Sequence, residues 1–316
     1  MPRPQFSQLW RDTERALLDA GVKFGQGTED AAQEAAWMLI HSLGWPLLDS
    51  FARLPALQRK PVPEAAATRL RRLLERRLRS RRPLAYLLGE AWLGGQRFLA
   101  DERAIVPRSL IAELLPHTLD AWLQGMHAQH AAGSGDGRGE IPAGGPQRIA
   151  DICTGGASLA VLAALRWPRA RVTAADLSEP ALQLARANVE LHGLGQRVRL
   201  MHSDLFEAFE PGERFDLVLC NPPYVNEASM AALPAEFRHE PRLALAGGDD
   251  GMDLVRRLLR QAREHLQPHG VLVVEIGHER RHFDAAFPDL PVHWLPVSSG
   301  GDAVFLVEAA ALESPR

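Results

Sequence analysis

Cysteine is nearly absent from this chain of 316 residues, which has only Cys153 and Cys220. This scarcity excludes a disulfide framework and any cysteine-rich zinc site. No apolar run is long enough to span a membrane, and residues 1–5 lack the core of a signal peptide, so we expect a cytoplasmic protein. The net charge of −3 gives no overall attraction to nucleic acid. The remaining composition, 46% hydrophobic and 24% charged, is ordinary for a globular protein long enough for two domains.

The pattern of residues changes twice along the chain. Apolar residues at helix-like intervals, punctuated by glycines, predict a helical domain over residues 1–88. Residues 89–107 alternate aromatic and small residues around glycine turns, which predicts a β-hairpin linker. We expect one further domain over residues 108–316, containing strand–helix alternation. Within it, residues 133–145 are glycine-rich with little to bury and are interpreted as a flexible surface loop.

Arginine is concentrated in one segment, where it makes up eight of the fourteen residues from Arg69 to Arg82. Interleaved leucines predict an amphipathic helix with a basic outer face. A solvated helix surface explains this pattern without any function. The functional alternative is a weak contact with an acidic partner such as ribosomal RNA, and a non-enzymatic RNA-binding assembly factor is one interpretation of such a helix.

Seven apolar runs predict a Rossmann-like α/β fold after residue 148, because strands alternating with helices form a doubly wound sheet. The helices include residues 180–191, with Ser178 as N-cap and Gly193 beyond the end, and residues 253–266. In the strand order expected for this fold, the first and fourth strands are neighbours, so Cys153 and Cys220 should approach each other. The predicted strands are Arg148–Cys153, Arg171–Asp176, Arg197–His202, Phe215–Cys220, Gly270–Ile276, Val292–Val297 and Asp302–Glu308.

The tetrapeptide Asn221-Pro222-Pro223-Tyr224 directly follows the fourth of these strands. Two prolines cannot continue a β-ladder, so the chain must leave the sheet at Asn221. The carboxyl edge of an open α/β sheet is where ligands bind. A side-chain amide at this edge, together with carbonyl groups that the prolines hold in place, can form hydrogen bonds with an –NH2 group. A rigid strand-to-loop turn without chemistry is the alternative interpretation.

Acidic and small residues follow the first three predicted strands. Small residues let a ligand approach the backbone closely. Asp176, at the end of the second strand, is placed to accept both ribose hydroxyls, and Asp204 after the third can take an adenine amine. These features predict an adenosyl pocket, whose nucleoside could belong to NAD or to S-adenosylmethionine. The candidate cofactor-binding residues are Asp151, Cys153, Thr154, Gly155, Gly156, Asp176, Leu177, Asp204, Leu205 and Asn221.

Two details favour the methyl donor over NAD. The run from Gly155 to Ala160 lacks the G-x-G-x-x-G spacing that places a pyrophosphate on a helix N-terminus. Asp151 also suits a cationic sulfonium amino acid, whereas its carboxylate would repel a pyrophosphate.

The chain resembles the class I S-adenosylmethionine-dependent methyltransferases, and more narrowly the protein-(glutamine-N(5)) methyltransferase family. The stretches Gly25-Gln26-Gly27-Thr28 and Val106-Pro107-Arg108-Ser109 are similar to the branch that modifies ribosomal protein L-three. Another branch modifies peptide chain release factors. Ala157 departs from the family pattern, which commonly has glycine there. Further family-like stretches are residues 83–90, 221–224, 240–245 and 248–251.

The resemblance implies transfer of a methyl group from S-adenosyl-L-methionine, which becomes S-adenosyl-L-homocysteine, to a glutamine amide of ribosomal protein L-three. The substrate would be the ribosomal protein, alone or within a pre-ribosomal particle. By resemblance, the Asn221 oxygen and the Pro222 carbonyl each accept one amide N–H, and Tyr224 forms a wall of the pocket. Asn221, Pro222 and Tyr224 are thus the expected catalytic residues, with Pro223 added for substrate binding, and no metal is required.

Two alternatives stay open at this point. One is glutamine methylation of release factors. The other is a DNA adenine-amine methyltransferase, because those enzymes share the Asn-Pro-Pro-Tyr sequence and face the same –NH2 group. Such enzymes need a target-recognition region and usually flip a base, and the chain has no obvious basic, aromatic platform for base stacking.

Overall fold

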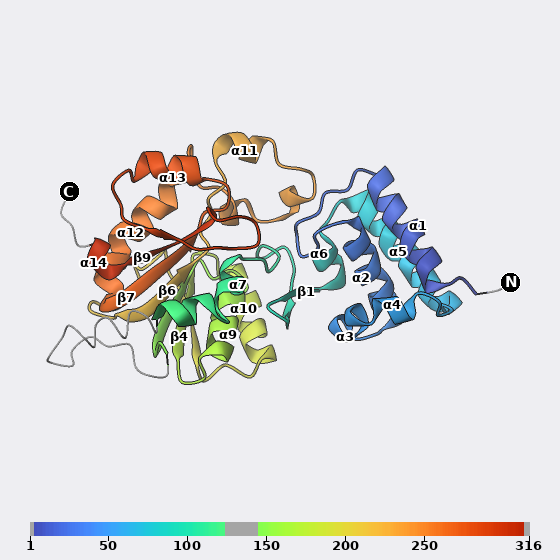
Figure 1. Ribbon diagram of the computed structural model, residues 1–316, viewed down its shortest axis with the longest axis horizontal. Coiled ribbons are helices and arrows are strands. Elements are labelled where there is room, and N and C mark those ends of the chain that lie inside the picture. Colours follow the sequence, from blue (N-terminus) through green and yellow to red (C-terminus); the bar gives the residue numbers. More distant parts are fainter. Residues whose placement is uncertain (1–2, 124–144, 313–316) are drawn as a thin grey trace. The chain divides into compact units, whose positions relative to one another are not determined.

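The computed structural model describes residues 3–123 and 145–312 (Figure 1). They form two compact units, Met1–Glu102 with Leu233–His239, and Arg103–Ala232 with Glu240–Arg316. The expected surface loop at residues 133–145 lies outside the described residues, apart from Gly145. The domain boundaries expected after residues 88 and 107 stay a prediction.

The first unit is built around α2, an apolar helix whose residues are nearly all buried. Asp30 caps its start by accepting a hydrogen bond from the Gln33 backbone N–H at 2.8 Å, and Gly44 ends it in the left-handed conformation. Helices α1, α3 and α5 pack against α2, which accounts for its lack of a polar face. The helices are α1 (Phe6–Asp19), α2 (Ala31–Leu43), α3 (Leu47–Ala52), α4 (Leu54–Leu57), α5 (Glu64–Ser80) and α6 (Leu84–Leu88).

The arginine-rich helix α5 forms as predicted, but the expectation that its arginines all face outward is wrong for Arg77. The Arg77 side chain is 1% exposed, and its Nε donates to the Glu34 carboxylate at 2.8 Å. Glu34 on α2 is itself buried, so each ion compensates the charge of the other. Arg81, in the left-handed conformation after the helix, binds the buried Glu236 at 3.1 Å.

The Gly-Gln-Gly-Thr stretch belongs to the same buried polar network. The Thr28 hydroxyl donates to Glu34 at 3.0 Å, and the Gln26 amide donates to the backbone oxygen of Glu236 at 3.5 Å. Glu236 comes from the segment Leu233–His239, which follows the tetrapeptide by nine residues yet belongs to the helical unit. Polar groups of the helical unit therefore fix this segment.

A β-hairpin completes the first unit, as predicted. Strands β1 (Glu90–Leu93) and β2 (Gln96–Leu99) pair antiparallel across Gly94 and Gly95. Both glycines have positive φ, 55° and 74°, which is the requirement of a two-residue type I′ turn. Glycine adopts this conformation without the Cβ clash that other residues would suffer.

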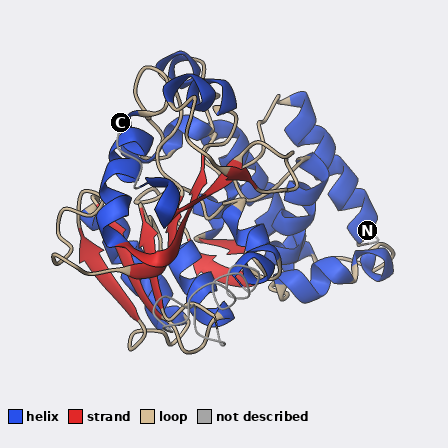
Figure 2. Cartoon of the chain, turned by 60° about the vertical axis from the view of Figure 1, so that its left-hand side comes forward, coloured by secondary structure: helices blue, strands red, loops and turns tan. Residues whose placement is uncertain are grey.

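The second unit contains a seven-stranded sheet with the order β5-β4-β3-β6-β7-β9-β8, in which β9 alone runs antiparallel to its neighbours (Figure 2). All seven predicted strands are found, and the Rossmann-like fold class is confirmed. The strands are β3 (Arg148–Ile152), β4 (Arg171–Asp176), β5 (Val198–His202), β6 (Phe215–Cys220), β7 (Leu266–Glu275), β8 (His293–Trp294) and β9 (Val304–Glu308).

Helices cover both faces of this sheet (Figure 1). Helices α9 and α10 pack together against β3, β4 and β5, and α12 and α14 pack against β7. Ser178 caps α10 through a hydrogen bond from the Ala181 backbone N–H at 3.3 Å, and Gly193 follows it with positive φ, as expected. The helices are α7 (Ile111–Leu114), α9 (Ser158–Arg166), α10 (Glu179–Leu191), α11 (Glu227–Ala231), α12 (Asp253–His265), α13 (Arg280–Ala286) and α14 (Ala309–Leu312).

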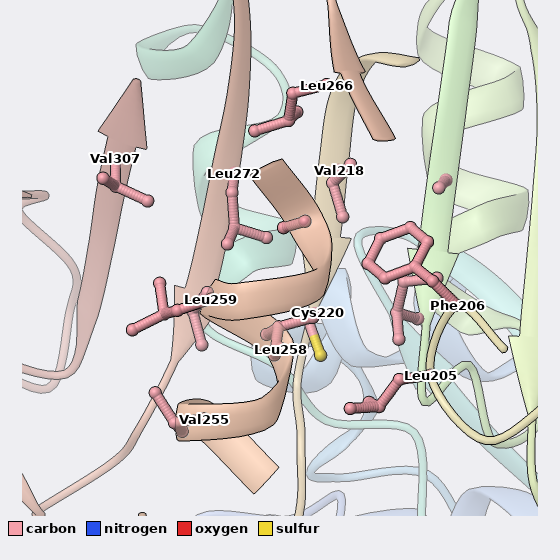
Figure 3. Packing of buried hydrophobic residues seen from close by; sticks show 14 of the residues in the cluster. Leu205, Phe206, Val218, Cys220, Val255, Leu258, Leu259, Leu266, Leu272 and Val307 are labelled. Atoms are coloured by element: carbon pink, nitrogen blue, oxygen red, sulfur yellow. The ribbon is translucent and has the colours of Figure 1, made fainter. Parts of the chain in front are cut away.

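Figure 3 shows the core between α12 and the sheet, where branched side chains of the helix lie over alternate residues of β6, β7 and β9. This packing makes the central strands rigid, so the residues at their carboxyl ends are held in place. The labelled core residues include Val218, Cys220, Val255, Leu258, Leu259, Leu272 and Val307.

Strand β7 begins four residues earlier than predicted, at Leu266 rather than Gly270. The proline and glycine before Val271 indicate a turn, but the chain continues through an irregular pairing with β6 between Phe215 and Leu217. A Cβ on Gly270 would lie 2.8 Å from the Phe215 backbone oxygen, so glycine permits this close approach.

Candidate active site

A cavity of about 860 Å³ opens at the carboxyl edge of the sheet, at the ends of β3, β4, β5 and β6. Eight of the residues singled out in the sequence line it: Cys153, Gly155, Asp176, Leu177, Asp204, Leu205, Asn221 and Pro223. Five others are absent from its lining: Asp151, Thr154, Gly156, Pro222 and Tyr224.

The loop after β3 is held in an unusual conformation. Cys153, Gly155 and Ala157 all have positive φ, of 60°, 56° and 63°. At Ala157 this conformation costs about 1–2 kcal/mol that glycine would not pay. Ala157 is fully buried and does not line the cavity, so its methyl group is directed into the protein. At Gly156 a Cβ would lie 3.3 Å from the Asn188 amide of α10, so this glycine serves helix packing.

Asp151 lies beneath the loop and fastens it from below. Its carboxylate accepts the Thr154 hydroxyl at 2.5 Å and the Ala160 backbone N–H at 2.9 Å. Burial raises the pKa of Asp151 to about 7, and the hydrogen bonds only partly offset this. The side-chain hydrogen bonds that Asp151 and Thr154 make in the structure are therefore with each other and with the Ala160 backbone of the following helix.

Asp176 presents its carboxylate at the cavity from the end of β4. The backbone N–H groups of Gly155 and Ser178 each donate to one of its oxygens at 2.8 Å. Desolvation by burial raises the pKa of Asp176 despite these bonds. Next to it, Leu177 is 47% exposed and offers an apolar surface on the cavity wall.

Asp204 forms an ion pair that sequence reasoning missed. Arg257 of α12 lies 2.8 Å from its carboxylate, and both side chains line the cavity. The charge and hydrogen bond of Asp204 raise the pKa of Arg257 further above its ordinary value. No local pattern indicates this pairing, because Arg257 is one of several arginines on an amphipathic helix.

Asn221 lines the cavity, and a backbone contact orients its side chain. Its Nδ2 donates to the Arg108 backbone oxygen across a long hydrogen bond of 3.5 Å. This contact leaves the Asn221 Oδ1 as a hydrogen-bond acceptor. Pro222 and Pro223 are buried and direct the chain away from the sheet.

The Tyr224 side chain lies beyond the prolines in a closely packed position. Its hydroxyl is 3.4 Å from the Glu275 carboxylate, and burial raises the pKa of the phenol well above its ordinary value. A Cβ on Gly277 would lie 2.6 Å from the Tyr224 ring, so only glycine leaves room for the ring there. Likewise, a Cβ on Gly251 would lie 2.2 Å from the Tyr224 backbone oxygen.

Two buried glutamates hold the Val-Pro-Arg-Ser stretch against this region. Glu240 forms a two-pronged ion pair with Arg108 and accepts the Val106 backbone N–H at 2.9 Å. Glu275 accepts the Ser109 hydroxyl at 2.6 Å. Sequence reasoning missed both roles. A detectable signal existed for Glu275, since it is the lone charge at the end of a strongly apolar strand.

The two cysteines meet as expected. Strands β3 and β6 pair in parallel with Ile152 opposite Cys220, and the Cys153 and Cys220 thiols are hydrogen-bonded. Burial raises the pKa of the Cys220 thiol well above its usual value, so it is a neutral, unreactive group. Their proximity confirms the strand order on which the position of Asn221 depends.

Comparison with known proteins identifies the relatives of this chain. Residues 8–89 match the PrmC N-terminal domain family, and residues 140–285 match the methyltransferase small domain family. A ribosomal protein uL3 glutamine methyltransferase of Bordetella pertussis is 46% identical over 94% of this chain and 93% of its own length. Proteins of the same description from Burkholderia pseudomallei and Neisseria meningitidis are 44% and 43% identical, over 96% and 92% of this chain and 94% and 88% of theirs.

The chain belongs to the ribosomal protein uL3 glutamine methyltransferase family. The resemblance inferred from the motifs is thereby confirmed, including the choice between branches that rested on Gly-Gln-Gly-Thr and Val-Pro-Arg-Ser. The chain combines the PrmC N-terminal domain and the methyltransferase small domain in one polypeptide.

Proposed function

We propose that this protein transfers a methyl group from S-adenosylmethionine to the side-chain amide nitrogen of a glutamine in ribosomal protein uL3. The observation that carries the proposal is the orientation of Asn221. Its Nδ2 donates to the Arg108 backbone oxygen, which orients the side chain and presents its Oδ1 as a hydrogen-bond acceptor. An acceptor of this kind suits an incoming –NH2 group.

The cavity residues fit an adenosyl methyl donor. Asp176 is a partly buried carboxylate that can accept both ribose hydroxyls, and Leu177 and Leu243 offer apolar surface to an adenine ring. Gly155 permits close approach to the backbone, and Asp204 can accept from the adenine amine. When bound, the donor supplies a methyl group already activated by a positively charged sulfur.

The protein's task is to make an amide nitrogen reactive. The lone pair of this nitrogen is delocalised into the carbonyl, so the nitrogen is a poor nucleophile. In the proposal, the Asn221 oxygen and the Pro222 carbonyl each accept one N–H of the glutamine amide. Both hydrogen bonds strengthen as positive charge develops on the nitrogen, which stabilises the transition state more than the bound substrate.

The remaining assignments follow from where the side chains lie. Cys153, Leu205 and Asn221 would contact the cofactor directly, while Asp151, Thr154 and Gly156 would shape the loop that binds it. Pro223 and Tyr224 would complete the substrate side of the pocket.

Substrate recognition is assigned to the helical domain over residues 1–88, with residues 89–107 as linker and 108–316 as the methyltransferase domain. The protein acts in the cytoplasm on free uL3 or on a pre-ribosomal particle. Exposed arginines of α5, Arg72 and Arg76, supply a weak contact with ribosomal RNA.

The proposal is tested by offering alternative substrates to the purified protein. Labelled S-adenosylmethionine is incubated with uL3, a peptide chain release factor and adenine-containing DNA in separate reactions. We expect label on uL3, located on a glutamine amide by mass spectrometry, and none in a parallel reaction with Asn221→Ala. Label on the release factor or DNA with none on uL3 would overturn the proposal.

A further inference from the structure

Glu275 occupies the carboxyl end of β7, the neighbour of the strand that carries Asn221. It is 4% exposed, and its two oxygens have different partners. One accepts the Ser109 hydroxyl at 2.6 Å and the Leu110 backbone N–H at 2.9 Å, and the other accepts the Tyr224 hydroxyl. The carboxylate thus connects the Val-Pro-Arg-Ser stretch to the last residue of the tetrapeptide.

The direction of these hydrogen bonds determines what Tyr224 can offer. The Tyr224 hydroxyl is the donor in its contact with Glu275 and the carboxylate is the acceptor, so the phenolic proton is directed at Glu275. The oxygen of Tyr224 then has lone pairs left and no proton to donate. Asn221 presents a second acceptor, its Oδ1, because its Nδ2 is directed at the Arg108 backbone oxygen. Neighbouring residues therefore orient an acceptor oxygen on each of the two polar side chains of the tetrapeptide.

The residue at position 109 is critical to this arrangement. A serine donates its hydroxyl to Glu275 and holds that carboxylate in place. A proline there has no hydroxyl and no N–H to donate. Ser109 thus has a defined partner in Glu275, although the proposed chemistry assigns Ser109 no role.

We propose that Ser109 and Glu275 are positioning residues that hold the Tyr224 ring and its hydroxyl in the orientation required by the glutamine amide. This inference rests on the proposed function. Neither residue touches the reacting atoms. Ser109 fixes the Glu275 carboxylate, Glu275 fixes Tyr224, and Gly277 leaves the space for the ring.

The test is a double-mutant cycle of Glu275→Gln and Tyr224→Phe, assayed with uL3 at saturating methyl donor. Glutamine keeps the shape of the side chain, but it must turn its oxygen toward Ser109 and the Leu110 N–H, which presents an N–H donor to Tyr224. We expect each single variant to lower kcat about tenfold, the effect of one lost hydrogen bond, with the KM for the methyl donor unchanged. The double variant should be no slower than Tyr224→Phe alone. Ser109→Ala should lower kcat about threefold.

Independent losses that multiply in the double variant would overturn the inference, and so would an unchanged kcat in Glu275→Gln. Asp216→Asn is the matched control, because Asp216 is a buried carboxylate on β6 at the opposite end of the strand from Asn221. It should lower thermal stability and leave kcat unchanged. If Glu275→Gln does not fold, Ser109→Ala combined with Tyr224→Phe replaces it in the cycle.

A spectroscopic measurement separates this inference from the proposed function. The chain has only two tyrosines, so Tyr86→Phe leaves Tyr224 as the sole phenol. Its tyrosinate absorbance should stay low as the pH is raised to about 11, above the ordinary tyrosine pKa of about 10. Burial is the first cause of the raised pKa of Tyr224 and the nearby Glu275 carboxylate is the second, so Glu275→Gln should increase the absorbance at a given alkaline pH. No increase would refute the pairing even in an enzyme active on uL3. An increase in a protein inactive on uL3 would refute the function alone.

Discussion

The two sides of the cavity are built in different ways. On the side of the methyl donor, Asp176 is fixed by backbone N–H groups 2 and 21 residues away in sequence. On the side of the methyl acceptor, Asn221 is held by the Arg108 backbone 113 residues away, and Ser109 reaches Glu275 across 166 residues. Apart from the ion pair of Asp204 with Arg257, the donor side is thus determined by local sequence, whereas the acceptor side depends on long-range contacts. This difference predicts that the two sides can be damaged separately.

The largest effect is expected from Asn221→Ala. It removes an acceptor whose hydrogen bond strengthens in the transition state, so kcat should fall about 100- to 1000-fold, as when an oxyanion-hole donor is lost. The affinity for S-adenosylmethionine should stay within a few-fold, measured by calorimetry. Turnover near that of the wild type would show that the acceptor side does not depend on Asn221.

A smaller effect of the opposite kind is expected from Asp176→Ala. Loss of charge-assisted hydrogen bonds to the ribose should raise the dissociation constant of the methyl donor about 10- to 150-fold. Turnover at saturating donor should change little, because the proposal assigns Asp176 to the ribose of the donor and not to the glutamine amide. Calorimetric titration of the variant checks this, and unchanged affinity would mean that the ribose binds elsewhere.

The smallest expected effect is a change in how stability depends on pH, caused by Asp151 beneath the loop after β3. The pKa of Asp151 is about 7 in the folded state and lower in the unfolded chain, so the folded protein binds this proton more tightly. The stability from this proton is therefore present at low pH and is lost as the pH rises toward 7. The free energy of unfolding is measured with urea at several pH values between 4 and 7. Plotted against pH, it should have a slope about 1 kcal/mol per pH unit more negative in the wild type than in Asp151→Asn. Parallel curves would show that Asp151 titrates normally.

The donor side and the fold were largely predictable from sequence for one physical reason. Apolar runs, glycine turns and the acidic residue at the end of β4 act over short stretches of chain. The position of Cys153 beside Cys220 followed from strand order alone. Strand boundaries were wrong at Gly270, where an irregular ladder replaces the expected turn, and at Val292–Val297, where the strand is the shorter His293–Trp294.

The acceptor side was predicted only in part, through Asn221 and the prolines. Glu240 and Glu275 were missed because their partners lie far away in sequence, and a charge in an isolated stretch indicates solvent rather than burial. Arg77 was misplaced on the outer face of α5 for the same reason, since its partner Glu34 lies on another helix. Long-range ion pairs need the folded chain to be recognised.

The central claim is that donor binding and methyl transfer depend on different residues of one cavity. The most direct test is a single-turnover measurement of methyl transfer to uL3 at saturating S-adenosylmethionine for Asp176→Ala and Asn221→Ala. For Asp176→Ala we predict a rate within a few-fold of the wild type. For Asn221→Ala we predict a rate that is lower than the wild type by about 100-fold or more. Equal losses in the two variants, or a slow Asp176→Ala beside a fast Asn221→Ala, would contradict the account.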